Sequence, residues 1–406
     1  MLNDISLKEA FELVLKNITP TTLTKTISLN QALGEFLAED IIAKRDAPAF
    51  SNSAMDGFGF KHSNSKKLKI IKTIYAGDKF EDFELNEDEC VRIMTGAKVP
   101  KNVNTIIPIE KCLKVTDKYI EIPEIKKGAN VRVKGEEIKK GEILIQKGEE
   151  ITPETIALLA SQGIYFVKVF IKPKIAILSS GNELKEPWEK ANDDEIYNVN
   201  SHAIKALLQN KGFNAEIIGI IPDNFEKTVE FINSLKNYNV IITSGGISFG
   251  DADFIFKAFK QNGLKELFHG IKLKPGRPTM VGFMKKTLVF AMPGNPISSY
   301  LNTFFLAIPT LRKLSGANKY YYNFVYAKNK NEFKLNPKKA HTALGVLKYG
   351  EWEVINNYKY GSSMLSALAK ANSLIVVDEG KEKIKEDLVK IIPFNTDFVK
   401  KGMFFN

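Results

Sequence analysis

The sequence predicts a multidomain α/β protein: a central α/β domain with a mostly parallel sheet covered by helices, a small β-dominated domain, an N-terminal helical region and a C-terminal β domain. The chain has 406 residues, of which 44% are hydrophobic, so it can bury large cores and exceeds the size of one typical domain. Strand-like and helix-like segments alternate from residue 171 to about residue 314, which is typical of a parallel sheet. Short β-like runs precede and follow this part.

Changes in composition and periodicity set the expected domain boundaries. The first boundary falls at the proline-bearing segment RDAPAF, where helical patterns give way to glycine and short β-like runs. A later helix is expected in EEITPETIALLASQGI, with Thr152 as its N-cap, Pro153 at its first position and Gly163 at its end. The predicted parts are a helical linker domain (1–45 with 140–170), the small β-rich domain (46–139), the α/β domain (171–316) and the C-terminal β domain (317–406).

The α/β domain is expected to place its polar loops at one edge of the sheet. The expected strands are KIAILSSGNEL, NAEIIGIIPDN, NVIITSGG and TLVFAMPGNP, and the expected helices are NSHAIKALLQNKG, FEKTVEFINSL, about Asp253 to Asn262, and Ile297 to Leu314. In such sheets, ligands bind at the carboxyl ends of the strands. The segments SSGNEL, PDN, SGGISFGDAD and PGNP follow the strands and are polar, glycine-rich or acidic, so they are expected to converge on one crevice.

The segment NVIITSGGISFGDADFIFKAF, residues 239–259, indicates which ligand suits that crevice. Its β-branched start predicts a strand buried on both faces. The four residues TSGG then allow a tight turn with bare backbone N–H groups, a geometry that suits an anion. Two interpretations of Asp251 and Asp253 remain open: a helix cap, or ligands of a metal ion that bridges the protein to phosphate.

Composition and charge restrict the class of function. The net charge of +11 raises a nucleic-acid hypothesis, but only five of the 58 basic residues are arginine and the lysines are scattered, which favours a solvated lysine-rich surface. The apolar stretches are shorter than a membrane span and the N-terminus does not resemble a secretory signal, so a cytoplasmic protein is expected. Cys90 and Cys112 provide neither a disulfide framework nor a metal cluster, and the four histidines lack zinc-ligand spacing.

Six motifs occur in order along the chain. They are SNSAMDGFGF (51–60), VRIMTGAKVP (91–100), SSGNEL (179–184), TSGGISFGDADF (243–254), KPGRPT (274–279) and MPGNPISS (292–299). Together they resemble the MoeA family, the molybdopterin molybdenumtransferases, which are related to the C-terminal domain of gephyrin and to its plant counterpart. Each motif alone is weak, whereas six in the order of the family are specific, and the resemblance spans nearly the whole chain.

The resemblance implies an enzyme that acts in the last step of molybdenum cofactor biosynthesis. It inserts molybdate into adenylylated molybdopterin, which residues 171–316 would bind, and releases AMP with the help of Mg²⁺ or another divalent cation. Such a site must hold a pyrophosphate and a tetrahedral oxyanion together, which requires backbone donors, cations and a metal. The implied partners are a second copy in a homodimer, the upstream adenylyltransferase and downstream molybdoenzymes, but neither nucleic acid nor a membrane.

The resemblance also implies which residues carry the chemistry. Catalytic roles fall on Asp253, Glu183, Asp56 and Thr95, and the implied metal ligands are Asp251, Asp253 and Glu183. Asp56 and Thr95 belong to the β-rich domain, which in the family covers the crevice of the other subunit. The alternative interpretation is that SAMDG and MTG are only turns within a β domain.

The expected substrate-binding residues lie on the remaining loops. Lys274 and Arg277 flank a rigid Pro-Gly turn and, with Ser298, are implied to hold molybdate, although a β-turn with solvated charges is the alternative. PGNP predicts a rigid strand-to-helix turn whose helix start suits phosphate. The full expected set is Ser244, Gly245, Gly246, Ser248, Asp223, Lys274, Arg277, Pro293, Gly294, Asn295, Pro296 and Ser298.

Three positions depart from the family pattern. Asn182 and Asn198 each replace an acid, and Lys334 stands where an arginine is often found. These departures concern the affinity for the metal and for the oxyanion rather than the class of protein. A non-enzymatic gephyrin-like scaffold or binding protein is kept as the alternative function, because the related domain of gephyrin also serves in receptor clustering. The retained acids, such as Asp253 with Glu183, favour catalysis because a scaffold does not need them.

Overall fold

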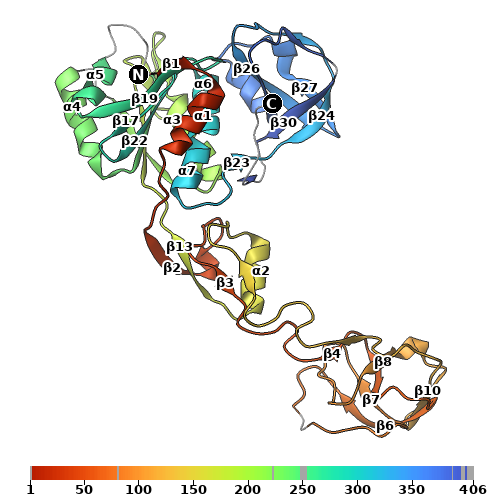
Figure 1. Cartoon of the computed structure of the whole chain (residues 1–406). Helices are drawn as coiled ribbons and strands as arrows, with labels where there is room; N and C mark the ends of the chain where they lie inside the picture. The colour runs from red at the N-terminus through yellow and green to blue at the C-terminus, as the bar shows by residue number, and fades with distance from the viewer. Residues whose placement is uncertain are drawn as a thin grey trace. The chain divides into compact units, whose positions relative to one another are not determined.

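The computed structural model describes residues 2–79, 82–221, 224–246, 254–385, 387–394 and 398–399. The chain, drawn in Figure 1, divides into two compact units. The first unit comprises Met1–Glu39, Lys147–Pro153 and Phe166–Asn406, and the second comprises Asp40–Gln146 and Glu154–Tyr165. Within the described residues, no helix is both long enough and apolar enough to cross a bilayer.

A seven-stranded sheet forms the centre of the first unit, in the order β1-β19-β21-β22-β18-β14-β17 (Figure 1). Strand β21 runs antiparallel to both of its neighbours and the other pairs are parallel, so the predicted mostly parallel α/β fold is confirmed. The strands are β1 (Leu2–Ile5), β14 (Ile175–Ser179), β17 (Ala215–Ile220), β18 (Val240–Ser244), β19 (Leu264–Ile271), β21 (Met280–Met284) and β22 (Thr287–Met292).

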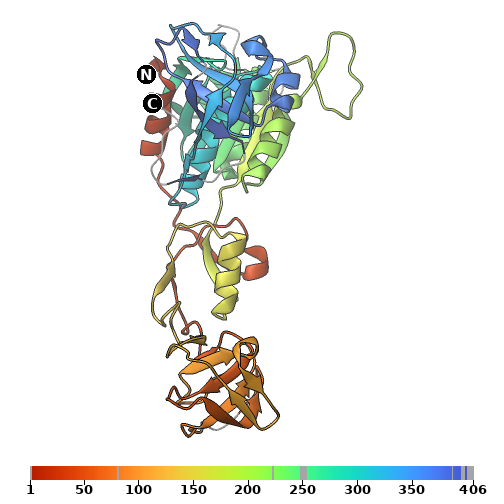
Figure 2. The same cartoon turned by 90° about the vertical axis from the view of Figure 1, so that its right-hand side faces the viewer.

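Helices cover both faces of this sheet because its central strands are apolar on both sides. In β18, Val240 and Ile242 belong to the core on the side of α1, α3, α6 and α7, whereas Ile241 belongs to the core on the side of α4 and α5. The helices are α1 (Leu7–Lys16), α3 (Val199–Asn210), α4 (Phe225–Ser234), α5 (Phe254–Gln261), α6 (Pro296–Asn302) and α7 (Ile308–Leu314). The segment between the short paired strands β15 (Leu184–Lys185) and β16 (Ile196–Tyr197) extends away from the domain as a loop (Figure 2).

The prediction of a single α-helix from Ile297 to Leu314 is wrong in one respect. Residues Thr303–Ala307 form a π-helix between α6 and α7. Pro309 lies in the first turn of α7. Proline has no N–H to donate and its ring excludes the carbonyl four residues earlier, which explains the widened turn.

The part of the N-terminal region in the first unit, residues 1–39, contains the predicted helix α1 and also two strands that its helical pattern does not reveal. Ser6 caps α1 through a capping box with Glu9. Strand β1 pairs with β19, and β2 (Thr24–Ser28) pairs with β13 (Phe166–Phe170). Both partners are distant in sequence, so local periodicity cannot predict these strands.

The C-terminal β domain is part of the first unit. Its pairings β26-β27-β24-β30-β28-β26 close five strands into a barrel, and β20 pairs with β26. The strands are β20 (Leu273–Lys274), β24 (Val325–Asn329), β26 (Ala340–Lys348), β27 (Glu351–Val354), β28 (Ser373–Val377) and β30 (Leu388–Pro393), with α8 (Leu365–Lys370) beside them. Two short pairs also occur, β23 (Tyr321–Tyr322) with β31 (Phe398–Val399) and β25 (Phe333–Lys334) with β29 (Lys383–Ile384).

The second unit contains the predicted β-rich domain. Its six-stranded sheet has the order β8-β5-β7-β6-β10-β9. The elements are β3 (Ile41–Ile42), β4 (Asn52–Ser53), β5 (Gly57–Phe60), β6 (Lys67–Ile74), β7 (Glu89–Ile93), β8 (Thr105–Pro108), β9 (Lys114–Val115), β10 (Tyr119–Glu121), β11 (Val131–Arg132), β12 (Ile143–Ile145) and α2 (Pro153–Ser161).

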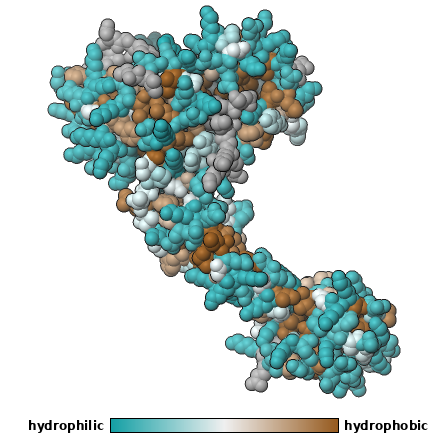
Figure 3. Space-filling model, in the orientation of Figure 1, coloured by the Kyte–Doolittle hydropathy of each residue, from teal (hydrophilic) through white to brown (hydrophobic). Residues whose placement is uncertain are grey.

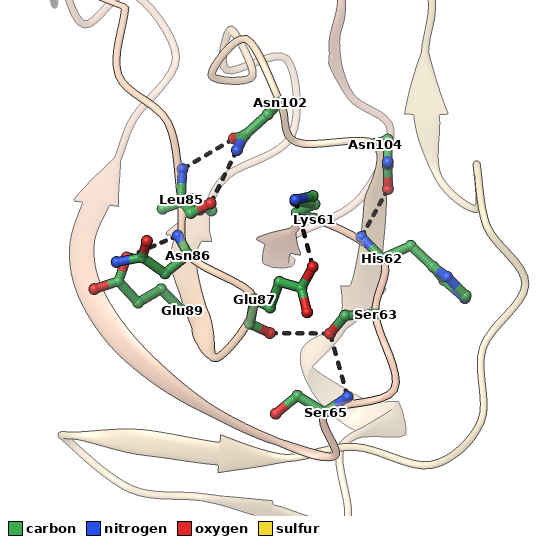
Figure 4. A network of polar contacts seen from close by, with 10 residues as sticks. All are labelled: Lys61, His62, Ser63, Ser65, Leu85, Asn86, Glu87, Glu89, Asn102 and Asn104. Carbon is green, nitrogen blue, oxygen red and sulfur yellow. Dashed lines mark hydrogen bonds and ion pairs between the residues drawn. The ribbon is translucent and has the colours of Figure 1, made fainter.

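Polar contacts hold the loops of this β-rich domain in place (Figure 4). The Asn102 side chain accepts a hydrogen bond from the Leu85 N–H at 3.0 Å and donates one to the Leu85 carbonyl at 2.9 Å. The His62 N–H donates to Asn104 Oδ1 at 2.9 Å. On the face drawn in Figure 3, hydrophilic residues cover most of each unit and hydrophobic residues form small patches.

Candidate functional site

The loops that follow three parallel strands start at the same level of the sheet. Ser179 at the end of β14 is paired with Ser244 at the end of β18, and Ser244 is paired with Met292 at the end of β22. A Cβ atom on Gly294 would lie 3.7 Å from the Cα of Gly245, so the loops after β18 and β22 are in contact. The structure therefore brings SSGNEL, TSGG and PGNP together, as the sequence predicts.

Ser244 is the centre of a polar network that joins these loops. Its hydroxyl donates to the Pro293 carbonyl at 3.2 Å and accepts from Asn200 Nδ2 at 2.7 Å and from Ser299 Oγ at 3.2 Å. Asn200 Nδ2 also donates to the Gly294 carbonyl at 2.7 Å. Helix α3 thus holds the ends of β18 and β22 together through one amide group.

The two glycines after Ser244 are required by the backbone. Gly245 and Gly246 both have left-handed φ angles, of 85° and 69°. A Cβ on Gly245 would lie 2.9 Å from the Ser180 carbonyl oxygen, and one on Gly246 would lie 2.4 Å from Ile255 Cδ1. The expectation that both N–H groups are bare is wrong for Gly245, because its N–H donates to the Met292 carbonyl at 3.1 Å.

Asn198, a position where an acid is expected from the sequence, has a specific role in this structure. It caps α3, and its Oδ1 accepts from Ser179 Oγ at 2.8 Å and from the Ser201 N–H at 3.3 Å. Its Nδ2 donates to Glu186 Oε1 at 2.9 Å, and Glu186 Oε2 lies 3.1 Å from His202 Nε2. An aspartate cannot donate to Glu186, so the amide at position 198 matches the carboxylate beside it.

The PGNP turn forms the predicted strand-to-helix junction but leaves fewer free donors than expected. Asn295 is the N-cap of α6 and Pro296 occupies its first turn. The Ile297 N–H donates to the Ser362 carbonyl at 2.9 Å. The expected phosphate site at this helix start therefore lacks that donor, because the C-terminal β domain already uses it.

The KPGRPT loop is attached to α6 through Asn302. Asn302 Nδ2 donates to the Gly276 carbonyl at 2.8 Å and to Thr279 Oγ1 at 2.5 Å. The Asn302 side chain is fully buried and its Oδ1 has no hydrogen-bond partner in the described structure. Ser298 is four residues earlier on α6 and therefore shares the face of the helix that meets the loop. The predicted grouping of Ser298 with this loop is consistent with that geometry.

The two predicted cations of KPGRPT differ in their surroundings. Lys274 is exposed and pairs in register with His341 of β26. The Arg277 guanidinium donates to both carboxylate oxygens of Asp4, at 2.9 and 2.6 Å. The hydrogen bond from Arg277 lowers the pKa of Asp4, and the same pair raises the pKa of Arg277. Arg277 is thus held in a fixed orientation by β1.

Glu183 is the implied metal ligand that the structure describes. Glu183 is exposed. A Cβ on Gly181 would lie 2.7 Å from each carboxylate oxygen of Glu183, so this carboxylate packs directly against Gly181. Glu183 lies in the loop between β14 and β15, and carboxylate oxygens are the ligands that hard divalent cations prefer. Within the ranges that the structure describes, no group of three His, Cys, Asp or Glu side chains could hold a metal.

Asp56 and Thr95 meet in the β-rich domain. Asp56 Oδ1 accepts from the Thr95 N–H and from Thr95 Oγ1, both at 2.7 Å. These two hydrogen bonds, the backbone one first, lower the pKa of Asp56. Asp56 of SAMDG and Thr95 of MTG are 39 positions apart in the sequence. In the structure, the Asp56 carboxylate and the Thr95 hydroxyl group are hydrogen-bonded to each other.

Four of the predicted site residues lie outside the described part of the chain, namely Asp223, Ser248, Asp251 and Asp253. Three residues that the structure places at the site, Asn200, Asn302 and Asp4, were not among the sequence predictions. Asn200 belongs to the segment NVN, residues 198–200, in which only Asn198 was singled out from the sequence. Nothing in the sequence around Asp4 or Asn302 indicates their partners, which are remote along the chain.

The fold and the site define an α/β protein whose polar, glycine-rich loops meet at the carboxyl ends of three parallel strands, where proteins of this architecture bind their ligands. Comparison with known families gives three matches. The MoeA N-terminal region (domain I and II) matches residues 5–163, a probable molybdopterin binding domain matches residues 176–313, and the MoeA C-terminal region (domain IV) matches residues 326–394.

Similar proteins cover nearly the whole chain. A molybdopterin molybdenumtransferase of Haemophilus influenzae is 32% identical over 96% of this chain and 99% of its own length. One from Staphylococcus epidermidis is 31% identical over 94% of this chain and 93% of its own. A crystal structure of the molybdopterin biosynthesis moeA protein from Pyrococcus horikoshii OT3 is 28% identical, with a TM-score of 0.84, and covers 96% of this chain and 100% of that chain.

The chain belongs to the MoeA family of molybdopterin molybdenumtransferases. The prediction of an enzyme of molybdenum cofactor biosynthesis, made from six motifs, is therefore confirmed.

Proposed function

We propose that this enzyme inserts molybdate into adenylylated molybdopterin and releases AMP. The observation that carries the proposal is the meeting of three loops at one sheet edge, where Asn200 joins Ser244 to Gly294. The KPGRPT loop leads into β21 beside the end of β22 and is bound by Asn302 of α6. The substrate has a charged phosphoanhydride, and the second substrate is a tetrahedral dianion. A site formed by glycine-rich loops and two cations suits both.

Different residues of the chain bind the two substrates. The loop from Ser244 to Gly246 supports the phosphoanhydride, with Asn200 holding its base rigid. Lys274 and Arg277 attract molybdate, and Asp4 fixes the orientation of the guanidinium so that less freedom is lost on binding.

Glu183, with Asp251 and Asp253 as further ligands, would hold a divalent cation at this edge. When bound, a divalent cation would neutralise charge on the phosphate oxygens. Support for this assignment comes from the exposed residue Glu183 in the loop that follows β14.

A single-turnover assay tests the reaction. Adenylylated molybdopterin is mixed with excess enzyme, with and without molybdate, and AMP is quantified. We expect AMP release that depends on molybdate in the parent and a loss of at least about tenfold in Glu183→Gln, since an amide is a weaker ligand for a hard cation. AMP release that is the same with and without molybdate would contradict the proposed reaction.

We also propose that the enzyme is a homodimer in which Asp56 and Thr95 of one copy act at the crevice of the other. Both hydrogen bonds from Thr95 go to Asp56 Oδ1, so the second oxygen, Oδ2, would contact a substrate or a metal ion. Chains with Asp56→Ala and chains with Glu183→Gln, each inactive alone, should regain activity after subunit exchange, because one site per mixed dimer is intact. Exchange demonstrated with two affinity tags but without recovery would place both residues in the same site of one chain.

The proposal places this reaction in the cytoplasm. Cys90 and Cys112 are both free thiols, which agrees with a reducing compartment.

A further inference from the structure

A cavity of about 750 Å³ lies at the end of the α/β sheet opposite to the candidate site. Its lining includes Lys172 and Pro173, which precede β14, Asn239, which precedes β18, and Leu288 near the start of β22. The same three strands end at the candidate site, so the cavity and the site occupy opposite ends of the sheet. The volume is in the range of small-molecule sites.

One wall of the cavity is apolar. Ile18 and Leu288 line it and are 6% and 2% exposed, and the partly buried Phe283 and Leu314 complete the wall. These side chains come from the end of α1, the β21–β22 hairpin and the end of α7. Contact with this wall would remove apolar surface of a ligand from water.

The rim of the cavity is positively charged. Its described lining contains three lysines and no acidic residue. The positive charge of Lys172 is compensated within the protein, since its Nζ lies 3.6 Å from the Glu35 carboxylate and donates to the carbonyls of Gly34 and Gly212. Lys285 and Lys286 are exposed, and neither has an ion-pair partner among the described residues.

Lys285 occupies an unusual backbone conformation. Met284 pairs with Thr287, so Lys285 and Lys286 form the two-residue turn of the β21–β22 hairpin. Lys285 has a φ angle of 58°, a left-handed value at which glycine or asparagine is preferred. The turn therefore keeps a lysine where an uncharged residue fits the backbone better, and both lysines line the cavity.

We infer that this cavity binds a small organic anion with an apolar body, such as an aryl or acyl carboxylate or sulfonate. We place the anionic group between Lys285 and Lys286 and the apolar body against Ile18, in a cavity that Thr19 and Thr22 also line. A free inorganic anion lacks the apolar part and binds more weakly. The inference does not depend on the proposed reaction, because no residue of the candidate site lines the cavity.

The probe for the test is 1-anilinonaphthalene-8-sulfonate, an aromatic anion whose fluorescence rises in an apolar site. We expect the full chain to bind one equivalent of the probe at this cavity. The double variant Lys285→Gly/Lys286→Ala should lower the affinity of that site about threefold to thirtyfold, which is the effect of removing two exposed charges. Glycine suits the left-handed φ at position 285, so this variant retains the hairpin. Raising the salt concentration should weaken binding at this site, whereas the neutral N-phenyl-1-naphthylamine should respond little to salt or to the variant.

The matched control is Lys126→Ala/Lys127→Ala, an adjacent exposed lysine pair in the β-rich domain that changes the net charge equally. We expect its affinity for the probe to equal that of the parent. A second variant, Thr22→Trp, fills the cavity from its exposed rim and should abolish the binding of that one equivalent. The inference is overturned if both site variants bind the probe like the parent, or if the control pair weakens binding as much as the site pair.

Discussion

Asn198→Asp introduces the acid that is expected at this position from the sequence and should destabilise this protein. Asn198 is 1% exposed, and its Nδ2 donates to Glu186 Oε1 at 2.9 Å. An aspartate has nearly the same shape and keeps the bonds accepted from Ser179 and Ser201. It loses the donor to Glu186, however, and places two carboxylates against each other in a buried site.

The size of the effect follows from these contacts. A hydrogen bond to a charged acceptor contributes about 1.5 to 3 kcal/mol, and charge repulsion adds to its loss. Protonation of the introduced carboxyl limits the total, because shifting its pKa from about 3.9 to above 7 costs about 4 kcal/mol at pH 7. We therefore expect the free energy of unfolding to fall by about 2 to 4 kcal/mol at pH 7.

The effect should depend on pH in a defined direction. The neighbouring Glu186 raises the pKa of the introduced carboxyl in the folded state, so the folded state binds more protons than the unfolded state. Stability then falls as the pH rises through the interval between the unfolded and the folded pKa values. The penalty should be small near about pH 4 and complete at neutral pH.

Urea unfolding followed by tryptophan fluorescence measures this change. Trp188 and Trp352 are the two tryptophans of the chain, and both lie in the first unit, as Asn198 does. Adding Glu186→Gln to Asn198→Asp should recover most of the loss, because the new amide can donate to the aspartate and accept from His202. A single variant as stable as the parent, or a double variant no more stable than the single one, would refute this account of Asn198.

Three further variants test the candidate site. Asn200→Ala removes the amide that joins Ser244 to Gly294, and we expect molybdate-dependent AMP release to fall at least about tenfold; unchanged turnover would exclude a positioning role. Arg277→Ala should raise the half-saturating molybdate concentration about threefold to tenfold with little change in nucleotide binding, since the side chain is exposed. A collapse of nucleotide binding instead would make KPGRPT a phosphate clamp. Asp4→Asn keeps Arg277 but loosens it, so its effect on molybdate should be smaller and in the same direction; a larger effect than that of Arg277→Ala would contradict the proposed order of roles.

Several features of the fold could be predicted because they depend on local chemistry. The β-branched run at Val240 predicted a strand buried on both faces, and β18 is such a strand. The helix expected at Pro153 begins there. The polar loops after β14, β18 and β22 were predicted to meet because carboxyl ends of parallel strands share an edge, and their registers confirm it.

Side-chain partners could not be predicted from the same patterns. The Asp4 and Arg277 pair joins residues 273 positions apart, and the two lie close only because β1 adds to the sheet beside β19. The bond from Gly245 to Met292 likewise depends on the register of β18 and β22. Sequence periodicity states which face a residue occupies but not which distant residue lies opposite.

The sequence by itself therefore determined the fold class, the strand-end position of the site and the family, because glycine-rich turns and apolar periodicity act over a few residues. Only the tertiary structure decided which donors remain free, how Arg277 is oriented and why an amide suits position 198 beside Glu186. Those properties depend on hydrogen bonds and charges between segments that meet only after the sheet has formed. A buried carboxylate requires a donor within about 3 Å, and the chain supplies that donor from another element.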